Sequence, residues 1–122
     1  MQFPLRIILL LLCTACVLSG CASDEEKTLS HFNKGKTYFE SNQYREAELE
    51  LRNALKIDSA YFDAHMLLGE TYLKLNNPQK AFNSFARAAE IDPQSKDAHL
   101  KVASLLFLGR QMPGEVSIKS LK

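Results

Sequence analysis

Three evenly spaced histidines are the residues of this chain with the most evident capacity for metal chemistry. His31, His65 and His99 recur every 34 residues. A zinc site needs its ligand nitrogens ~2.0–2.1 Å from one ion. A regular period instead gives each structural unit one histidine at the same position, with a unit's width between successive copies. We therefore predict that the histidines pack structurally and hold no metal; a metal-dependent enzyme using all three is an alternative.

The cysteines suggest a different chemistry. Cys13 and Cys16 form a C-x-x-C pair, which in other settings carries redox chemistry. Both lie in the apolar run Ile7–Leu18, which is shorter than the ~20 residues that span a bilayer. With Arg6 before it and small residues after it, this run is typical of a secretory signal peptide over residues 1–20. Cys21 is then the only cysteine of the mature chain, so no internal disulfide is expected.

The residues Leu18-Ser19-Gly20-Cys21 resemble the lipobox of bacterial lipoproteins, in which the cysteine thiol is acylated and the chain is cut just before it. The resemblance implies lipidation at Cys21 (palmitate or a similar acyl chain) and, because Ala22 rather than Asp follows, sorting to the outer membrane, facing the periplasm. Residues 21–27 would be the lipidated N-terminus and a polar tether. An uncleaved anchor helix with an incidental cysteine is the competing interpretation.

Composition excludes several function classes. Of 15 basic residues one is Arg6, which leaves 14 against 14 acidic residues, so neither nucleic-acid binding nor a polybasic membrane patch is expected. No nucleophile-elbow, H-E-x-x-H or phosphate-binding glycine motif occurs. We predict no enzyme activity, no cofactor and no small-molecule substrate. Glu46, Glu48 and Glu50, with Arg45 and Arg52, are expected to form a solvated helix face.

The elements that position these residues repeat. Residues 28–61 align with 62–95 at an offset of 34, with identical residues at His31/His65, Gly35/Gly69, Thr37/Thr71, Tyr38/Tyr72, Asn42/Asn76, Ala47/Ala81, Ala54/Ala88, Ile57/Ile91 and Asp58/Asp92. In the second unit, apolar residues at helical spacing predict helices over Ala60–Leu75 and Pro78–Ile91. Asn76-Asn77 separates them, and Asp92-Pro93 ends the second.

Residues 28–109 resemble the tetratricopeptide repeat (TPR). The resemblance implies an all-α solenoid of helical hairpins with two full repeats (28–61 and 62–95) and one further helix. Small residues allow close helix approach and large ones fill the gaps; these packing positions are Gly35, Tyr38, Ala47, Ala54, Gly69, Tyr72, Ala81, Phe85, Ala88, Pro93 and Ala103. The chain departs from the family in having histidine where tryptophan is usual.

The third unit is incomplete. Residues 96–110 predict its first helix, but a second helix is not indicated, and residues 111–122 are expected to form an irregular tail. Arrays usually end in a helix with a polar outer face, whereas here Leu105–Leu108 would face solvent on one side. The chain is therefore interpreted either as a truncated, non-functional fragment of a longer array or as an array whose end a partner covers.

In TPR arrays the first helix of each hairpin lines a concave groove. Carried onto this chain, the family's groove positions are Phe32, Lys36, Phe39, Met66, Glu70, Leu73, Leu100, Ser104 and Phe107. Such a set suits an extended or helical peptide with apolar anchors. The function expected is a periplasmic scaffold that binds another envelope protein or peptide segment, anchored to the membrane through the Cys21 lipid.

The pathway is less constrained by the sequence. The second unit and the motif 48–55 are similar to TPR lipoproteins encoded with exopolysaccharide and PEP-CTERM export systems. A pilotin-like or outer-membrane assembly TPR lipoprotein is the alternative within the envelope.

Overall fold

The computed structural model describes residues 23–111, and this part of the chain is helical without a strand. Helical residues 23–40 are followed by four further helices: α2 (Tyr44–Ile57), α3 (Phe62–Lys74), α4 (Pro78–Ile91) and α5 (Lys96–Gln111). Among the described residues, none of these helices combines the length and apolarity needed to cross a membrane. The predictions for the signal peptide 1–20, for Cys13, Cys16 and Cys21, and for 112–122 lie outside the described residues.

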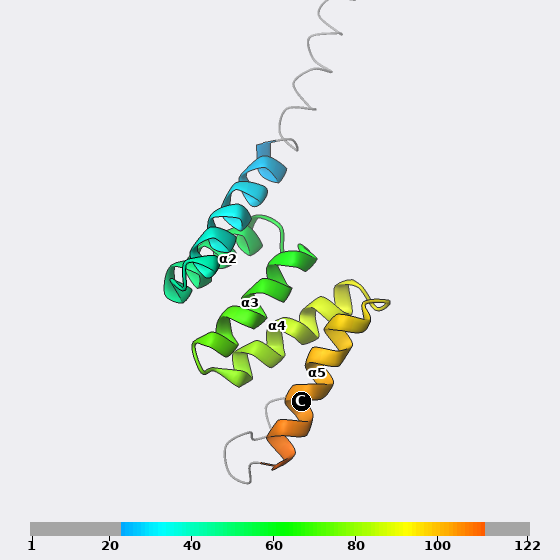
Figure 1. The fold of residues 1–122 in the computed structure, drawn as a ribbon. Coiled ribbons are helices and arrows are strands. Elements are labelled where there is room, and N and C mark those ends of the chain that lie inside the picture. The colour runs from blue at the N-terminus through cyan, green and yellow to red at the C-terminus, as the bar shows by residue number, and fades with distance from the viewer. Residues whose placement is uncertain (1–22, 112–122) are drawn as a thin grey trace, which may run out of the picture.

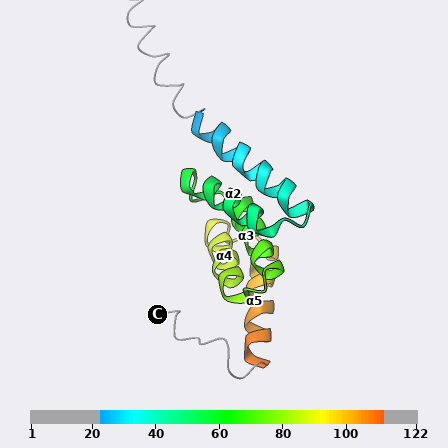
Figure 2. The ribbon, with the colours of Figure 1, turned by 90° about the vertical axis from the view of Figure 1, so that its left-hand side faces the viewer.

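The helices stack in chain order. α2 packs on α3, α3 on α4 and α4 on α5. The helix of residues 23–40 lies at one end of the stack and α5 at the other (Figures 1 and 2). This arrangement confirms the predicted all-α solenoid, with two helical hairpins and one further helix.

The same turn joins the two helices of each hairpin. Asn42 and Asn76, 34 residues apart, adopt the left-handed conformation with φ of 61° and 56°. Asparagine tolerates this region better than most residues do. The amide after each asparagine closes the turn: Gln43 N–H donates to the Tyr38 carbonyl at 2.8 Å, and Asn77 N–H to the Tyr72 carbonyl at 2.8 Å. The Asn77 side chain then caps α4 by accepting from Lys80 N–H at 3.1 Å.

Glycine sets the spacing between the helices of each hairpin. A Cβ placed on Gly35 would lie 2.8 Å from Cγ of Leu51, and one on Gly69 would lie 2.6 Å from Cε1 of Phe85. Leu51 and Phe85 are fully buried, so a shift of either side chain would disturb the packing around it. The large residue of the second helix therefore rests directly on the backbone of the first, as the small-and-large pattern predicts.

The other predicted packing residues mostly line the same core. The four helix-contact alanines are fully buried and Tyr72 is 7% exposed; these alanines are Ala47, Ala54, Ala81 and Ala88. Tyr38 is half-buried, and Pro93 is exposed just beyond the end of α4. Ala103 departs from the prediction: it is exposed, because within the described residues no second helix of the third unit packs on α5.

The predicted tether is also partly wrong. Residues 23–27 are helical and extend the first helix beyond the hairpin. Asp24, Glu25 and Glu26 are exposed on this helix. Thr28, which is buried, donates its hydroxyl to the Asp24 carbonyl at 2.9 Å. The described part of the predicted tether, residues 23–27, is therefore helix.

Candidate functional site

The nine predicted groove residues occupy repeat-equivalent positions on three helices. Phe32, Lys36 and Phe39 lie on the helix 23–40, with Met66, Glu70 and Leu73 on α3 and Leu100, Ser104 and Phe107 on α5. Within each helix the spacing of four and then three places the residues on one face. We call these nine residues the groove set.

Exposure of the groove set increases toward the C-terminal helix. Phe32 and Met66 are half-buried against the core, and Phe32 makes an edge-on contact with Tyr61 at a ring-centroid distance of 5.1 Å. Phe39 contacts Tyr44 in the same way at 5.5 Å. These contacts hold three of the apolar side chains partly within the fold.

The freely available apolar side chains of the groove set are Leu73, Leu100 and Phe107. Leu73 is 36% exposed, and Leu100 and Phe107 are 64% and 61% exposed. Ser104 donates its hydroxyl to the Leu100 carbonyl at 2.8 Å, so the hydroxyl is already bonded within α5. The C-terminal half of the groove set is therefore the part that can bury apolar surface on binding.

Glu70 is tied to the neighbouring unit. Its carboxylate accepts a hydrogen bond from the Lys101 ammonium of α5. This hydrogen bond raises the pKa of Lys101, burial opposes the rise, and the charges of Glu70 and Asp97 add to it. Lys101 also lies 5.9 Å from the ring centroid of Phe85. Glu70 consequently presents a compensated charge to a ligand rather than a free carboxylate.

The three histidines serve the loops and the first hairpin. His65 donates from Nε2 to the Ser59 carbonyl at 3.0 Å, and His99 donates to the Pro93 carbonyl at 3.0 Å. His31, which has no preceding repeat loop, instead donates from Nδ1 to Glu50 at 2.7 Å. Among residues 23–111, no group of three or more His, Cys, Asp or Glu is arranged to hold a metal ion.

The expectation of a solvated Glu46–Glu50 face is wrong for two of its residues. Besides Glu50, which accepts from His31, Glu48 accepts a hydrogen bond from the Tyr72 hydroxyl at 3.2 Å. The Glu48 side chain is only 14% exposed. Burial raises the pKa of Tyr72, and the negative charge and hydrogen bond of Glu48 raise it further, while the charge of Arg52 lowers it. No local sequence pattern marks this contact, since the partners are 24 residues apart.

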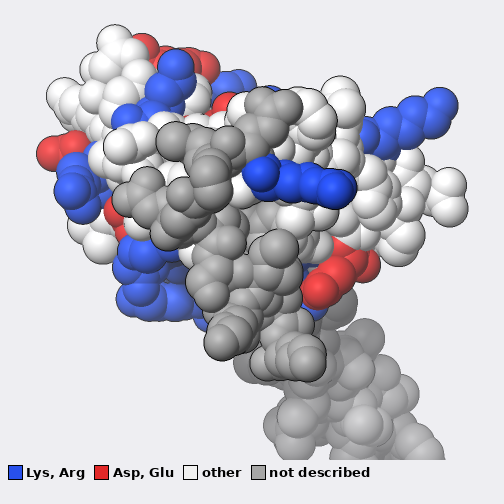
Figure 3. Space-filling view, turned by 90° about the horizontal axis from the view of Figure 1, so that it is seen from below, with Lys and Arg blue, Asp and Glu red and all other residues white. Residues whose placement is uncertain are grey.

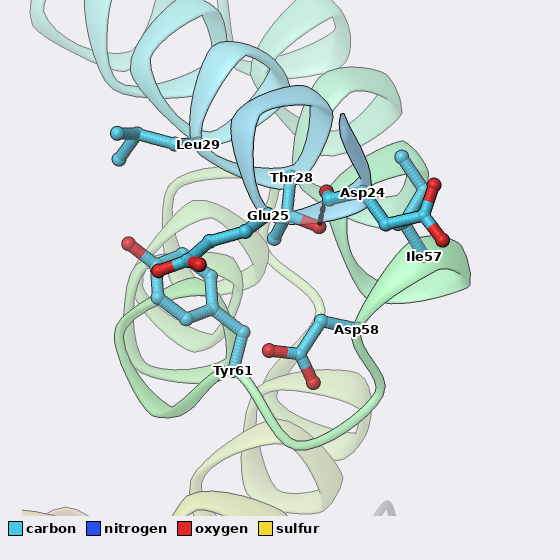
Figure 4. A pocket seen from close by; sticks show the side chains of 7 residues that line it. All are labelled: Asp24, Glu25, Thr28, Leu29, Ile57, Asp58 and Tyr61. Carbon is cyan, nitrogen blue, oxygen red and sulfur yellow. Dashed lines mark hydrogen bonds between the residues drawn. The ribbon is translucent and has the colours of Figure 1, made fainter. Parts of the chain in front are cut away.

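A pocket of about 480 Å³ lies where the extended first helix overhangs the connection between α2 and α3. Asp24 and Glu25 approach from the helix 23–40, with Asp58 and Tyr61 from the connection (Figure 4). Burial raises the pKa of Tyr61, and the charges of Asp63 and Asp58 add to the rise. Sequence reasoning missed this pocket, because residues 23–27 were expected to form a tether.

A second, more open pocket of about 370 Å³ is bordered by α2, α3 and α4 and carries basic side chains. Arg52 pairs with Glu48 at 3.7 Å and Arg87 with Glu90 at 2.8 Å. Lys80 lies 5.3 Å from the ring centroid of Tyr72. Basic and acidic side chains are also interspersed on the face seen in Figure 3. Arg52, Arg87 and Lys80 of this pocket thus already have partners within the fold.

Comparisons with known proteins agree with this architecture. The tetratricopeptide repeat family matches residues 32–96, more than half of the chain. The chain therefore belongs to the tetratricopeptide repeat family. No curated protein sequence matches it. Among solved structures, the fold is similar to one described as "First TPR of Spaghetti (RPAP3) bound to HSP90 peptide SRMEEVD", with a TM-score of 0.66 and 19% identity over 79% of this chain and 76% of that chain.

Proposed function

We propose that this chain is a scaffold that binds a segment of another protein on its groove set and performs no reaction. The proposal rests on three exposed apolar side chains of the groove set, Leu73, Leu100 and Phe107. Leu73 and Phe107 occupy the same repeat position, and Leu100 lies on the same helix as Phe107. The similar TPR structure is described as bound to a peptide, which supports a peptide as the kind of ligand. Buried apolar anchors contribute ~1.5–3 kcal/mol each relative to exposed ones.

The proposed location is the cell envelope. The lipobox resemblance at Leu18–Cys21 supports acylation of Cys21 and retention at the outer membrane, facing the periplasm. One acyl chain anchors only marginally, whereas several chains anchor stably. The described helix already includes residue 23, two residues after Cys21 in the sequence.

The anchor is tested by replacing Cys21. The full-length Cys21→Ser variant should lose metabolic labelling with palmitate. Cys13→Ser and Cys16→Ser are matched controls that should remain labelled. Labelling that persists in Cys21→Ser would refute the anchor.

The groove set is tested by crosslinking from intact membranes. Full-length wild type, a Leu100→Ser/Phe107→Ser variant and a Leu49→Ser variant are compared. Leu49 is 59% exposed on α2, so it matches Leu100 and Phe107 in exposure but lies outside the groove set. We expect one protein to be captured by wild type and Leu49→Ser and lost from the double variant. Equal capture by all three would contradict a groove-based function.

The pathway follows from the captured protein. We propose a role in exopolysaccharide or PEP-CTERM-type export, on the similarity of the second unit and of residues 48–55. Capture of an export component would support this role. Capture of a secretin or barrel-assembly protein would replace it with the pilotin-like alternative, and no specific capture would favour the truncated-array interpretation.

A further inference from the structure

One face of α5 is exposed in the part of the chain that the structure describes, and its first residue, His99, donates a hydrogen bond to the Pro93 carbonyl. We call it the outer face of α5 and define it by residues at spacings of four, three and four: His99, Ala103, Leu106 and Arg110. All four are exposed, and Leu106 is 47% exposed. The opposite side of the helix, with Ala98, Val102 and Leu105, packs on the stack. The chain therefore ends its described stack on a partly apolar helix face.

The preceding unit shows what such a face accepts. Ala103 and Leu106 lie 34 residues after Gly69 and Tyr72. In α3 those two positions are buried, and α4 supplies the contact with Phe85 against Gly69 and Lys80 over the Tyr72 ring. The outer face of α5 thus carries the small-then-large pattern that receives another helix, with a large side chain opposite the small one.

The other end of the stack does not carry this pattern. Positions that hold apolar contacts in α3, namely Ala64, Leu67 and Leu68, are taken by Ser30, Asn33 and Lys34 in the helix 23–40. These three polar residues are exposed. Head-to-tail stacking of copies would place this polar surface against the apolar outer face of α5, which does not match it. A contact between like ends has no such conflict.

The sequence after α5 also lacks the matching pattern. At the 34-residue offset, Glu115 and Lys119 stand where α4 has Ala81 and Phe85. Charged residues therefore replace the small contact alanine and the large aromatic residue. Residues 112–122 therefore do not offer the side chains with which α4 covers α3.

We propose that the outer face of α5 is the interface of a homodimer, in which two α5 helices pack antiparallel about a two-fold axis between residues 104 and 105. This register places Ala103 opposite Leu106 of the second copy, and Leu106 opposite the second copy's Ala103. The same axis brings His99 opposite Arg110 at both ends, as a polar rim. The face is self-complementary, as a two-fold interface requires.

The proposal leaves the groove set free. Leu100, Ser104 and Phe107 lie on the adjoining face of α5, about a quarter turn away at 3.6 residues per turn. A dimer would therefore present two copies of the groove set. A single helix pair buries less than the ~1,200 Å² at which standard interfaces begin, so the association is expected to depend on concentration.

Sedimentation equilibrium of the full-length chain in density-matched detergent tests the proposal. Wild type should change from one to two chains as concentration rises. Leu106→Glu should weaken dimerisation by ~10-fold or more, since it places a carboxylate in the interface centre. Leu29→Glu is the matched control: Leu29 is 48% exposed on the opposite end of the stack, and this variant should dimerise like wild type. Helix content by circular dichroism verifies that each variant is folded.

The register is tested with two differently tagged copies in membranes. Oxidation should crosslink an Ala103→Cys copy to a Leu106→Cys copy in higher yield than an Ala103→Cys copy to a Leu29→Cys copy, above the constant background of the native cysteines. A wild type that stays monomeric at every concentration would overturn the proposal. This holds even if a variant without residues 112–122 dimerises. Equal weakening by Leu106→Glu and Leu29→Glu would overturn it as well.

Discussion

α3 and α5 are the same element of successive units, but they have different numbers of neighbours. α3 packs between α2 and α4, whereas α5 packs on α4 and reaches α3 through the Lys101–Glu70 hydrogen bond. At equivalent positions Tyr72 is 7% exposed and Leu106 is 47% exposed. The position in the repeat thus determines which type of side chain stands there, and the following helix determines whether that side chain is buried. We therefore expect the side chains of α3 to contribute mainly to stability and those of α5 mainly to a binding surface.

The largest expected contrast is between the aromatic residue that covers α3 and the one exposed on α5. Phe85→Ala empties a fully buried site against Gly69, and we expect a loss of about 3–5 kcal/mol in the free energy of unfolding. Phe107→Ala removes a side chain that is 61% exposed, and should change stability by about 0.5 kcal/mol or less. Urea titration followed by circular dichroism measures both. Similar losses of unfolding free energy in the two variants would contradict the expected difference between the covered helix α3 and the exposed helix α5.

The small-residue positions should differ next. A Cβ on Gly69 would lie 2.6 Å from the ring of Phe85; overpacking costs ~1–3 kcal/mol, and alanine returns ~1 kcal/mol of helix propensity. We expect a net loss of about 1 kcal/mol for Gly69→Ala. Ala103→Ser, at the exposed equivalent position, should cost about 0.5 kcal/mol or less. The urea midpoints of the two variants decide between these values, and a stabilising Gly69→Ala would show that Phe85 moves aside.

Tyr72 gives the contrast a pH dependence. Tyr72→Phe removes the hydrogen bond to Glu48 and should cost about 1 kcal/mol at neutral pH. The folded pKa of Tyr72 is raised, chiefly by burial, so its contribution is complete below the unfolded value of 10.0 and is lost as pH rises through the folded pKa. Wild type should therefore lose stability above about pH 10, and Tyr72→Phe should lose less.

Leu106→Ala is the matched control for this pH series. It lies at the equivalent position of α5 and carries no titrating group, so its cost should be the same across the range. Tyr61, whose pKa is also raised by burial, should leave a residual alkaline loss in Tyr72→Phe. An alkaline slope identical to that of wild type would contradict the role assigned to the Tyr72 hydroxyl.

The sequence predicted the features that depend on neighbours within one repeat. The TPR resemblance identified Gly69 as a small packing position and Phe85 as a large one, and the structure shows Phe85 packed against Gly69. Asn76 was expected to end a helix, and its left-handed conformation does so. These features lie within one repeat, so the repeat pattern together with the family resemblance suffices to predict them.

Contacts that depend on a second unit, or on a missing one, were not predicted. Glu48 looked solvated because its partner, Tyr72, belongs to the next unit. Ala103 was expected to pack because its position is a packing position, yet the helix that would cover it is not among the described residues. Two apolar residues of the groove set, Phe32 and Phe39, make edge contacts with Tyr61 and Tyr44, which the repeat pattern does not predict.

The smallest expected effect concerns the ion pair that joins α3 to α5. Glu70→Gln keeps the size of the side chain and removes the charge that Lys101 faces. Both side chains are about one-third exposed, so the expected loss is about 0.5 kcal/mol and should vanish at high salt. Glu90→Gln is the control, since Glu90 pairs with Arg87 inside α4. A loss of about 2 kcal/mol that persists at high salt would exceed the usual range of surface ion pairs. It would mean that the charge pair, rather than apolar packing on α4, holds α5 in place. Packing on α4 would then not offset the free-energy cost of exposing the outer face of α5 to water.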